Sequence, residues 1–234
     1  MLKKFEVRGF KNFKENIQLN FSDVRDYKFN EQCVGKGLLN KIIIYGKNSV
    51  GKSNLGLALF DITTHLADKN VTPDLYDYYL NADLDSGFAE FHYVFKLEAG
   101  EIDYLYRKND VRELTFEKIS INNEVIMFYD YTTKSGNLEG LKKLAPSLNF
   151  EFQNENISIL KYVVNNTLSN TAAPLKQLMR FVNNMLWFRS LDENRYIGYK
   201  KGSEDYINFI FEKDYLETFQ DLLHTAGVNE DLVA

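Results

Sequence analysis

The segment from Gly46 to Ser53 reads GKNSVGKS and fits the pattern G-x-x-x-x-G-K-[ST] at every fixed position. Its two glycines let the backbone curl tightly, so that successive N–H groups can point at one anion without a Cβ in the way. Lys52 adds a positive charge for the terminal phosphates, and the Ser53 hydroxyl is suited to bind Mg²⁺. The motif therefore predicts a loop that cradles a phosphate chain, with a buried strand before it and a helix after it.

The residues on both sides of the loop fit this requirement. Ahead of it, KIIIY (Lys41–Tyr45) is a β-branched run, which is typical of a central strand covered on both faces. Behind it, apolar residues recur at helical spacing and predict an amphipathic helix from Lys52 to about Ala67. These residues are Leu55, Ala58, Leu59, Ile62 and Leu66. The partial positive charge at the N-terminus of this helix would favour the same anion.

Several short runs alternate apolar and polar side chains, the period of a half-buried strand. Predicted strands lie at 5–13, 16–22, 89–97, 102–107, 114–121 and 125–129, and residues 23–40 and 70–87 are polar connections. Asn122 and Asn123 fit a tight hairpin turn, because asparagine tolerates positive φ. We therefore predict an α/β fold: a P-loop ATPase core with a mixed sheet that includes an antiparallel β-meander.

After Gly140 the pattern changes to helical stripes. One spans 175–186 with Pro174 in its first turn, and another spans 207–223 and ends before Gly227, a residue type common just past a helix. We interpret the first stripe as core packing. The chain is thus divided into an N-terminal lobe, residues 1–150, and a mostly helical arm, residues 151–234, with a soft boundary between about 130 and 155.

Composition excludes several functional classes. No apolar run reaches the roughly 18 residues that a membrane span needs, and the N-terminus lacks the apolar stretch of a secretory signal. Cys33 is the single cysteine and the three histidines lie far apart in the sequence, so neither a disulfide framework nor a zinc site is expected. We expect a cytoplasmic protein with no membrane partner.

Charge is distributed unevenly along the chain. Residues 1–60 contain 11 Lys and Arg against 5 Asp and Glu, whereas the whole chain has a net charge of −5. A basic front end can face phosphates or nucleic acid, although unevenly scattered surface lysines would give the same count. The overall acidity argues against a surface coated in DNA-binding charge. Any contact with DNA should therefore be local or made by an assembly.

The order of elements around the loop resembles the ATPase heads of the ABC type in the structural-maintenance-of-chromosomes (SMC) and OLD families. These include the AAA-labelled ATPases of bacterial anti-phage systems. The shared features are an N-terminal φxφxxFxxF strand and turn and a GxNxxGKSN loop. They are matched here by Phe5, Val7, Phe10 and Phe13, and by Gly46, Asn48, Gly51, Lys52, Ser53 and Asn54. The likeness is firm over 1–65, looser over 88–130 and only architectural beyond.

This resemblance implies a site for ATP and Mg²⁺. It gives Lys52 a catalytic role, assigns the metal to Ser53, and places Lys11, Asn12 and Phe13 near the adenine and ribose. The alternative for the last group is that Phe10 and Phe13 belong to the core and Lys11 is solvated. The loop residues that would hold the nucleotide are Gly46, Lys47, Asn48, Ser49, Val50, Gly51, Lys52, Ser53 and Asn54.

The same likeness implies that ATP drives two copies into a homodimer or a higher oligomer. The assembly would act on DNA through an effector, often a fused or separate nuclease in the resembled group, in anti-phage defence or DNA repair. Hydrolysis there needs an LSGGQ-like segment, a Walker B strand ending in Asp-Glu, and a switch histidine. Here VIMFYDY (Val125–Tyr131) lacks the Glu and is interpreted as a structural strand, and TLSNTA (Thr167–Ala172) lacks the glycines. Gln153 and Gln177 are candidates for the Q-loop by exclusion only.

Two explanations stay open for the missing elements. The chain is either the N-terminal portion of a longer ATPase, which we favour, or a protein that binds nucleotide without hydrolysing it alone. A stand-alone small-molecule kinase or GTPase is the rival class. Its nearest signals are RKND (Arg107–Asp110) as a guanine motif and FRSLDENR (Phe188–Arg195) as a lid, and neither is a good match. A nucleotide-sensing interaction module is the third reading.

Overall fold

The computed structural model describes residues 1–26, 28, 30–67, 73–150, 154–167, 172–189, 195–198 and 215–227. The chain divides into two compact units, Met1–Tyr199 and Lys200–Ala234. In the second unit the structure describes helix α6 (Leu216–Thr225), which is followed by Gly227 at φ 87° as the sequence predicts. Residues 207–214 of that predicted helical stripe lie outside the described residues.

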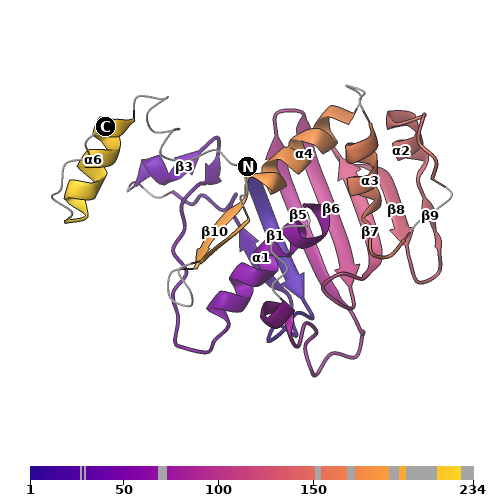
Figure 1. Cartoon of the computed structure of the whole chain (residues 1–234), viewed down its shortest axis with the longest axis horizontal. Helices are drawn as coiled ribbons and strands as arrows, with labels where there is room; N and C mark the ends of the chain where they lie inside the picture. The colour runs from indigo at the N-terminus through magenta and orange to yellow at the C-terminus, as the bar shows by residue number, and fades with distance from the viewer. Residues whose placement is uncertain are drawn as a thin grey trace. The chain divides into compact units, whose positions relative to one another are not determined.

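A seven-stranded sheet forms the centre of the first unit (Figure 1). The strand order is β2-β1-β5-β6-β7-β8-β9, and every pair is antiparallel. The strands are β1 (Leu2–Arg8), β2 (Ile17–Asn20), β5 (Ala89–Leu97), β6 (Gly100–Lys108), β7 (Leu114–Ile121), β8 (Glu124–Asp130) and β9 (Ser135–Asn137). The predicted meander is confirmed, including its turn at Asn122 and Asn123, whose φ angles are 50° and 67°.

The predicted mixed character of this sheet is wrong for the strands that the structure describes. Parallel neighbours need long crossover connections, whereas β5 to β9 follow one another through short turns that make each strand antiparallel to the last. The long connection from β2 to β5 carries α1, but it returns the chain to the far side of β1, again antiparallel. The fold is therefore a mixed α/β arrangement in which all described sheet pairs are antiparallel.

The strand predicted just before the phosphate loop does not form in the described part of the chain. Residues 41–47 have no regular secondary structure and pair with no described strand. The side chains of Ile43 and Tyr45 are 90% and 91% exposed, instead of buried on both faces. The physical reason is that β1 already has β2 and β5 as neighbours, so this sheet offers the segment no inner position.

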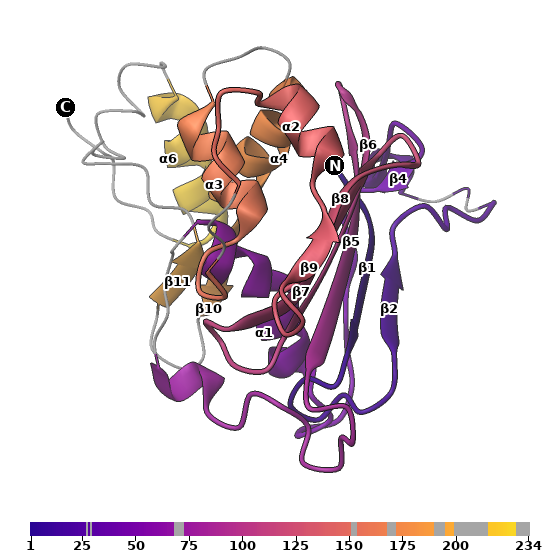
Figure 2. The same ribbon diagram turned by 90° about the vertical axis from the view of Figure 1, so that its right-hand side faces the viewer.

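Helices cover one face of the sheet, as the edge-on view in Figure 2 shows for α1, α3 and α4. Their bounds are α1 (Lys52–Leu66), α2 (Glu139–Leu144), α3 (Ile159–Asn166) and α4 (Ala173–Asn183). Smaller elements are the hairpins β3 (Val34–Gly35) with β4 (Leu38–Leu39) and β10 (Leu186–Arg189) with β11 (Arg195–Gly198), and the 3₁₀ helices η1 (Glu31–Cys33) and η2 (Pro73–Tyr76). Helix α1 confirms its predicted stripe, and α4 confirms the stripe predicted over 175–186 up to Asn183, with Pro174 in its first turn; Leu186 instead begins strand β10.

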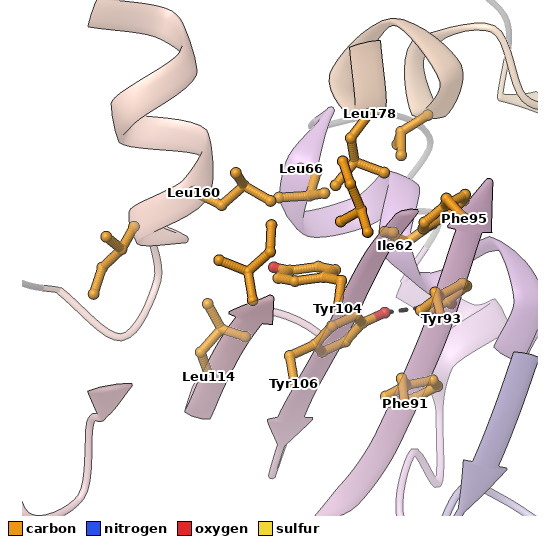
Figure 3. Packing of buried hydrophobic residues seen from close by; sticks show 14 of the residues in the cluster. Ile62, Leu66, Phe91, Tyr93, Phe95, Tyr104, Tyr106, Leu114, Leu160 and Leu178 are labelled. Carbon is orange, nitrogen blue, oxygen red and sulfur yellow. Dashed lines mark hydrogen bonds between the residues drawn. The ribbon is translucent and has the colours of Figure 1, made fainter. Parts of the chain in front are cut away.

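The core lies between this face and the helices and is unusually aromatic (Figure 3). Tyr93 lies opposite Tyr104 across β5 and β6, and Phe91 lies opposite Tyr106 with stacked rings 5.1 Å apart. Directly opposed aromatic pairs of this kind stabilise a sheet beyond the area they bury. Figure 3 shows Ile62 of α1 and other helical side chains pointing onto these rings.

One buried carboxylate fixes α3 on the sheet. Glu117 of β7 accepts hydrogen bonds from the hydroxyls of Tyr104 (2.9 Å), Tyr131 (2.8 Å) and Ser158 (2.6 Å), and from the N–H of Ile159 (2.9 Å). A negative charge at a helix N-terminus is favourable, because the first N–H groups of the helix have no partner within it. Glu117 therefore ties the start of α3 to the meander.

Candidate phosphate-binding site

The helix that follows the loop is held firmly at its far end. From Phe60 to Leu66 every side chain of α1 is buried, and the Tyr93 hydroxyl donates to the carbonyl of Ala58 (3.0 Å). Gly56 faces the ring of Trp187, and a Cβ there would lie 2.7 Å from it. Only glycine allows β10 to approach this closely. The helix start is exposed at Lys52 and Ser53, so α1 presents its N-terminus from a fixed base.

The loop itself depends on backbone angles that favour glycine. Ser49 has φ 64° and Gly51, the residue before the helix, has φ 101°. A Cβ on Gly51 would overlap the side-chain amide of Asn12, and one on Gly46 would lie 3.2 Å from Val50. Gly51 therefore has the backbone angle that favours glycine at the turn into α1, and Gly46 lies close to the Val50 side chain.

The backbone amides of the loop are unoccupied. Within the part of the chain that the structure describes, no N–H from Gly46 to Gly51 donates a hydrogen bond. Residues 46–50 are exposed. The first N–H groups of α1 also lack partners inside the helix. A row of free amides that continues into a helix N-terminus is the donor set that binds phosphate.

Lys52 closes the loop on itself. Its ammonium group donates to the carbonyls of Gly46 (2.8 Å) and Lys47 (2.7 Å), which lie at the start of the motif. The positive charge is thus held at the loop by two hydrogen bonds to exposed carbonyl oxygens, which carry no formal charge. A phosphate oxygen would compete well with these carbonyls, because it adds a full negative charge opposite the ammonium group.

The turn between β1 and β2 supports the loop from the other side. Asn54 donates its side-chain amide to the Asn12 side-chain oxygen (2.7 Å), and Asn12 in turn donates to the carbonyl of Val50 (3.3 Å). Asn12 therefore joins the loop, the first turn of α1 and the β1–β2 turn. Two sequence regions that are 42 positions apart thus contact each other in the structure.

The neighbours of Asn12 have different surroundings. Phe10 and Phe13 are buried in the core, which matches the alternative reading of these two rings. Lys11 adopts φ 48° and its ammonium donates to the carbonyl of Asp77 (2.7 Å). Partial burial lowers the pKa of Lys11 below its ordinary value, although Asp77 opposes this shift. Lys11 thus keeps a cation close to the loop support.

The donor set suits a nucleotide phosphate chain, and the cation that accompanies it has one candidate ligand. The Ser53 hydroxyl is exposed and forms no hydrogen bond with a described residue. Among the same residues no group of three or more His, Cys, Asp or Glu side chains is arranged to hold a metal ion. Ser53 could contribute one ligand to a Mg²⁺ ion that also binds the phosphates, and nucleotide-bound Mg²⁺ usually has a carboxylate among its ligands as well.

The remaining sequence candidates do not join the loop. Val125–Tyr131 contributes the meander strand β8, as interpreted from sequence, and Asp130 accepts the N–H groups of Thr132 and Thr133 in a turn (2.9 Å each). The side-chain oxygen of Gln177 accepts the N–H of Ala99 (3.0 Å). Residues 153, 168–171 and 190–194 lie outside the described residues, and with them Gln153 and most of the LSGGQ-like and lid candidates.

Sequence reasoning missed a buried ion pair beneath α1. Lys108, from the RKND segment, is fully buried and donates to Asp61 of α1 (2.9 Å) and to Thr64 (3.0 Å). A signal was present: Lys108 is in register with Tyr104 and Tyr106 on the inward face of β6, and Asp61 lies between apolar helix positions. Lys108 therefore serves the core and is not placed to read a guanine base.

Comparison of the chain with models of known protein families and with curated proteins found no match. Among the helices that the structure describes, none has the length and apolar character needed to cross a bilayer.

Proposed function

We propose that this chain binds ATP with Mg²⁺ through the loop Gly46–Ser53, as the nucleotide-binding part of an ABC-type ATPase head similar to those of the SMC and OLD families. The observation that carries the proposal is the row of unoccupied amides from Gly46 to Gly51, closed by the Lys52 ammonium. On nucleotide binding, Lys52 would exchange its two carbonyl partners for phosphate oxygens, and Ser53 would ligate Mg²⁺.

We further propose that ATP–Mg²⁺ brings two copies together to drive a DNA-directed effector, in anti-phage defence or DNA repair. Support comes from the exposed apolar run Ile42–Tyr45 directly before the loop. Exposed apolar patches of soluble proteins commonly mark surfaces that become covered. An assembly that covers this run would also bring the groups that turnover needs to the phosphate loop.

The test is ATP binding by the purified chain and its Lys52→Ala variant, measured by calorimetry with Mg²⁺ present. Loss of a charge-assisted hydrogen bond costs about 1.5–3 kcal/mol, so the variant should bind ATP at least tenfold more weakly. Lys41→Ala removes an equal charge five residues before the loop and is the matched control. It should bind like the wild type.

Light scattering of the same samples tests the assembly. The wild type should increase in mass with ATP–Mg²⁺, and Lys52→Ala should not. Equal ATP affinity in wild type and Lys52→Ala would refute the assignment of the loop. Normal ATP binding without any increase in mass would refute the assembly alone. Tighter binding of GTP than ATP would favour the rival phosphotransferase class.

A further inference from the structure

A second pocket lies at the other end of β1 from the phosphate loop. It has a volume of about 540 Å³, within the range of small-molecule sites, and it is formed by the starts of β1 and β4, the end of β5 and the last turns of α4. Because a strand rises about 3.3 Å per residue, the seven residues of β1 separate this pocket from the Asn12 turn by roughly 20 Å. We call it the Arg180 pocket.

Three cations line the Arg180 pocket without a counter-ion. They are Lys36 in the β3–β4 turn, Lys96 near the end of β5, and Arg180 in the last turn of α4. None of the three is within ion-pair distance of a carboxylate in the described ranges, although most other cations of the sheet are paired. With Glu98 as the one lining carboxylate, the side chains contribute a net charge of +2, and the Met1 amino group adds a further positive charge.

Placement at a helix C-terminus explains Arg180 alone, because the helix dipole attracts cations there. It does not explain why lysines from a hairpin and a strand face the same space. Like charges gathered around one cavity repel each other, as the lowered pKa of the Met1 amino group reflects: burial is the main cause and Lys36 adds to it. An anion in the cavity would remove this repulsion.

Apolar side chains also line the pocket. They are Leu38, Phe181 and Met185, and the Phe181 ring packs edge-on against Phe95 of the core at 5.2 Å. The hydrogen bond from the N–H of Ala99 to Gln177 (3.0 Å) ties the β5–β6 turn to α4. A cavity lined by both cations and supported apolar side chains fits a ligand with an anionic group and a ring.

We propose that the Arg180 pocket binds a small phosphomonoester that carries an apolar or aromatic ring, such as a nucleoside monophosphate. A phosphomonoester has a charge of about −1.5 to −2 at neutral pH, opposite in sign to the net positive charge of the lining. Arg180 can hold the phosphate through two parallel N–H donors, and the ring would lie against Phe181 and Met185. This site is independent of the phosphate loop.

The experiment is calorimetric titration of AMP into the full chain carrying Lys52→Ala, which weakens the phosphate loop and isolates the pocket. We expect one AMP per chain and at least tenfold weaker binding of inorganic phosphate, which lacks the ring. Arg180→Glu should weaken AMP binding at least tenfold, because it removes a charged donor and adds repulsion. Lys118→Glu makes the same charge change on the outward face of β7 and should leave AMP binding unchanged.

Circular dichroism confirms folding of each variant, and Lys36→Glu replaces Arg180→Glu if the latter does not fold. Absence of AMP binding at millimolar concentration, or equal affinity in Arg180→Glu and Lys118→Glu, would overturn the proposal. Equal affinity for inorganic phosphate and AMP would show that the ring does not contribute to binding, and that part of the proposal would be rejected. A 5′-phosphorylated oligonucleotide that binds far more tightly than AMP would move the phosphomonoester from a small molecule to a strand end, and the small-molecule assignment would be rejected.

Discussion

The two ends of α1 satisfy their polar groups in opposite ways. In its buried half, Asp61 accepts hydrogen bonds from Tyr79 (2.8 Å), Tyr106 (2.9 Å) and Lys108 (2.9 Å), so a charge in the core is fully paired inside the protein. At its exposed start, the amides of the loop that begins at Gly46 are left without internal partners. One helix thus joins a buried carboxylate that is paired inside the protein to a loop whose amides have no partner among the described residues.

This comparison distinguishes residues that stabilise the fold from residues that we propose to bind phosphate. Unpaired buried polar groups lower the free energy of unfolding, so the Asp61 carboxylate is tolerated in the core because its hydrogen-bond partners are present. Free amides at an exposed helix start are tolerated because water solvates them until an anion arrives. Variants at Asp61 and at the loop should therefore act on different quantities: unfolding free energy in one case and ligand affinity in the other.

The largest expected effect comes from breaking the buried pair. Lys108→Met leaves the Asp61 carboxylate without its cation in a fully buried site, which typically costs about 3–5 kcal/mol of unfolding free energy. Urea unfolding followed by circular dichroism measures the loss. Lys118→Met, on the outward face of the neighbouring strand β7, is the matched control and should cost under about 0.5 kcal/mol.

A second variant tests whether charge is the cause. Adding Asp61→Asn to Lys108→Met removes the buried carboxylate but keeps an oxygen acceptor for Tyr79, so part of the stability should return. If the double variant is no more stable than Lys108→Met, the cost arises from lost packing of the lysine side chain. The electrostatic account of this end of α1 would then be rejected.

Sequence patterns predicted the self-contained part of the fold well. Alternation located β5 to β8, and helical spacing located α1, because in both cases a single buried face determines which positions are apolar. Ile42, Ile43 and Ile44 show the limit of this reasoning: a β-branched run indicates a strand only where a neighbouring strand exists to pair with it. The positions of partner strands are tertiary information that the run does not contain.

Only part of the candidate site, like only part of the fold, could be predicted from the sequence. The motif itself identified Gly46 to Ser53, because its chemistry depends on local backbone geometry. The contacts of Asn12 with Val50 and Asn54 depend on the path of the chain over about 40 residues, and the sequence indicated them only through a family likeness. The sequence indicated Lys108 only as part of RKND, a poor match to a guanine motif, because a lysine is rarely fully buried and its partner Asp61 is distant in sequence.

The next prediction concerns the support between the two regions. Asn12→Ala removes the bridge from the β1–β2 turn to the phosphate loop, at a cost of about 1 kcal/mol, or roughly fivefold in ATP affinity. Unfolding free energy should change much less, because the bridge is exposed. Asn16→Ala removes a similar exposed hydrogen bond, to Glu6, and should leave ATP affinity unchanged. Equal ATP affinities of the two variants would show that Asn12 does not position the loop.

The smallest expected effect comes from a partly exposed cluster in which a histidine is paired with two carboxylates. On the outward face of the sheet, His92 contacts Glu6 (2.7 Å) through Nδ1 and Asp103 (2.9 Å) through Nε2. Burial lowers the pKa of His92, but the hydrogen bonds and charges of Asp103 and Glu6 outweigh it, so the pKa lies above the ordinary 6.5. With both ring nitrogens donating, the folded protein favours the imidazolium form.

The sign of the pH dependence follows from this shift. A raised folded-state pKa contributes stability that is fully present below the unfolded value and is lost as pH rises through the folded value. The wild type should therefore exceed His92→Gln in unfolding free energy most at pH 5.5, by under about 1 kcal/mol because the cluster is partly exposed, and the excess should fall by pH 9. Asp103→Asn removes one of the two carboxylates that raise the pKa of His92, so the excess should be lost at a lower pH than with both carboxylates present. If the excess in unfolding free energy instead grows between pH 5.5 and pH 9, the neutral ring is the stabilising form. The cluster would then resemble the neutral, solvated donors of the loop and not the paired charges of the core.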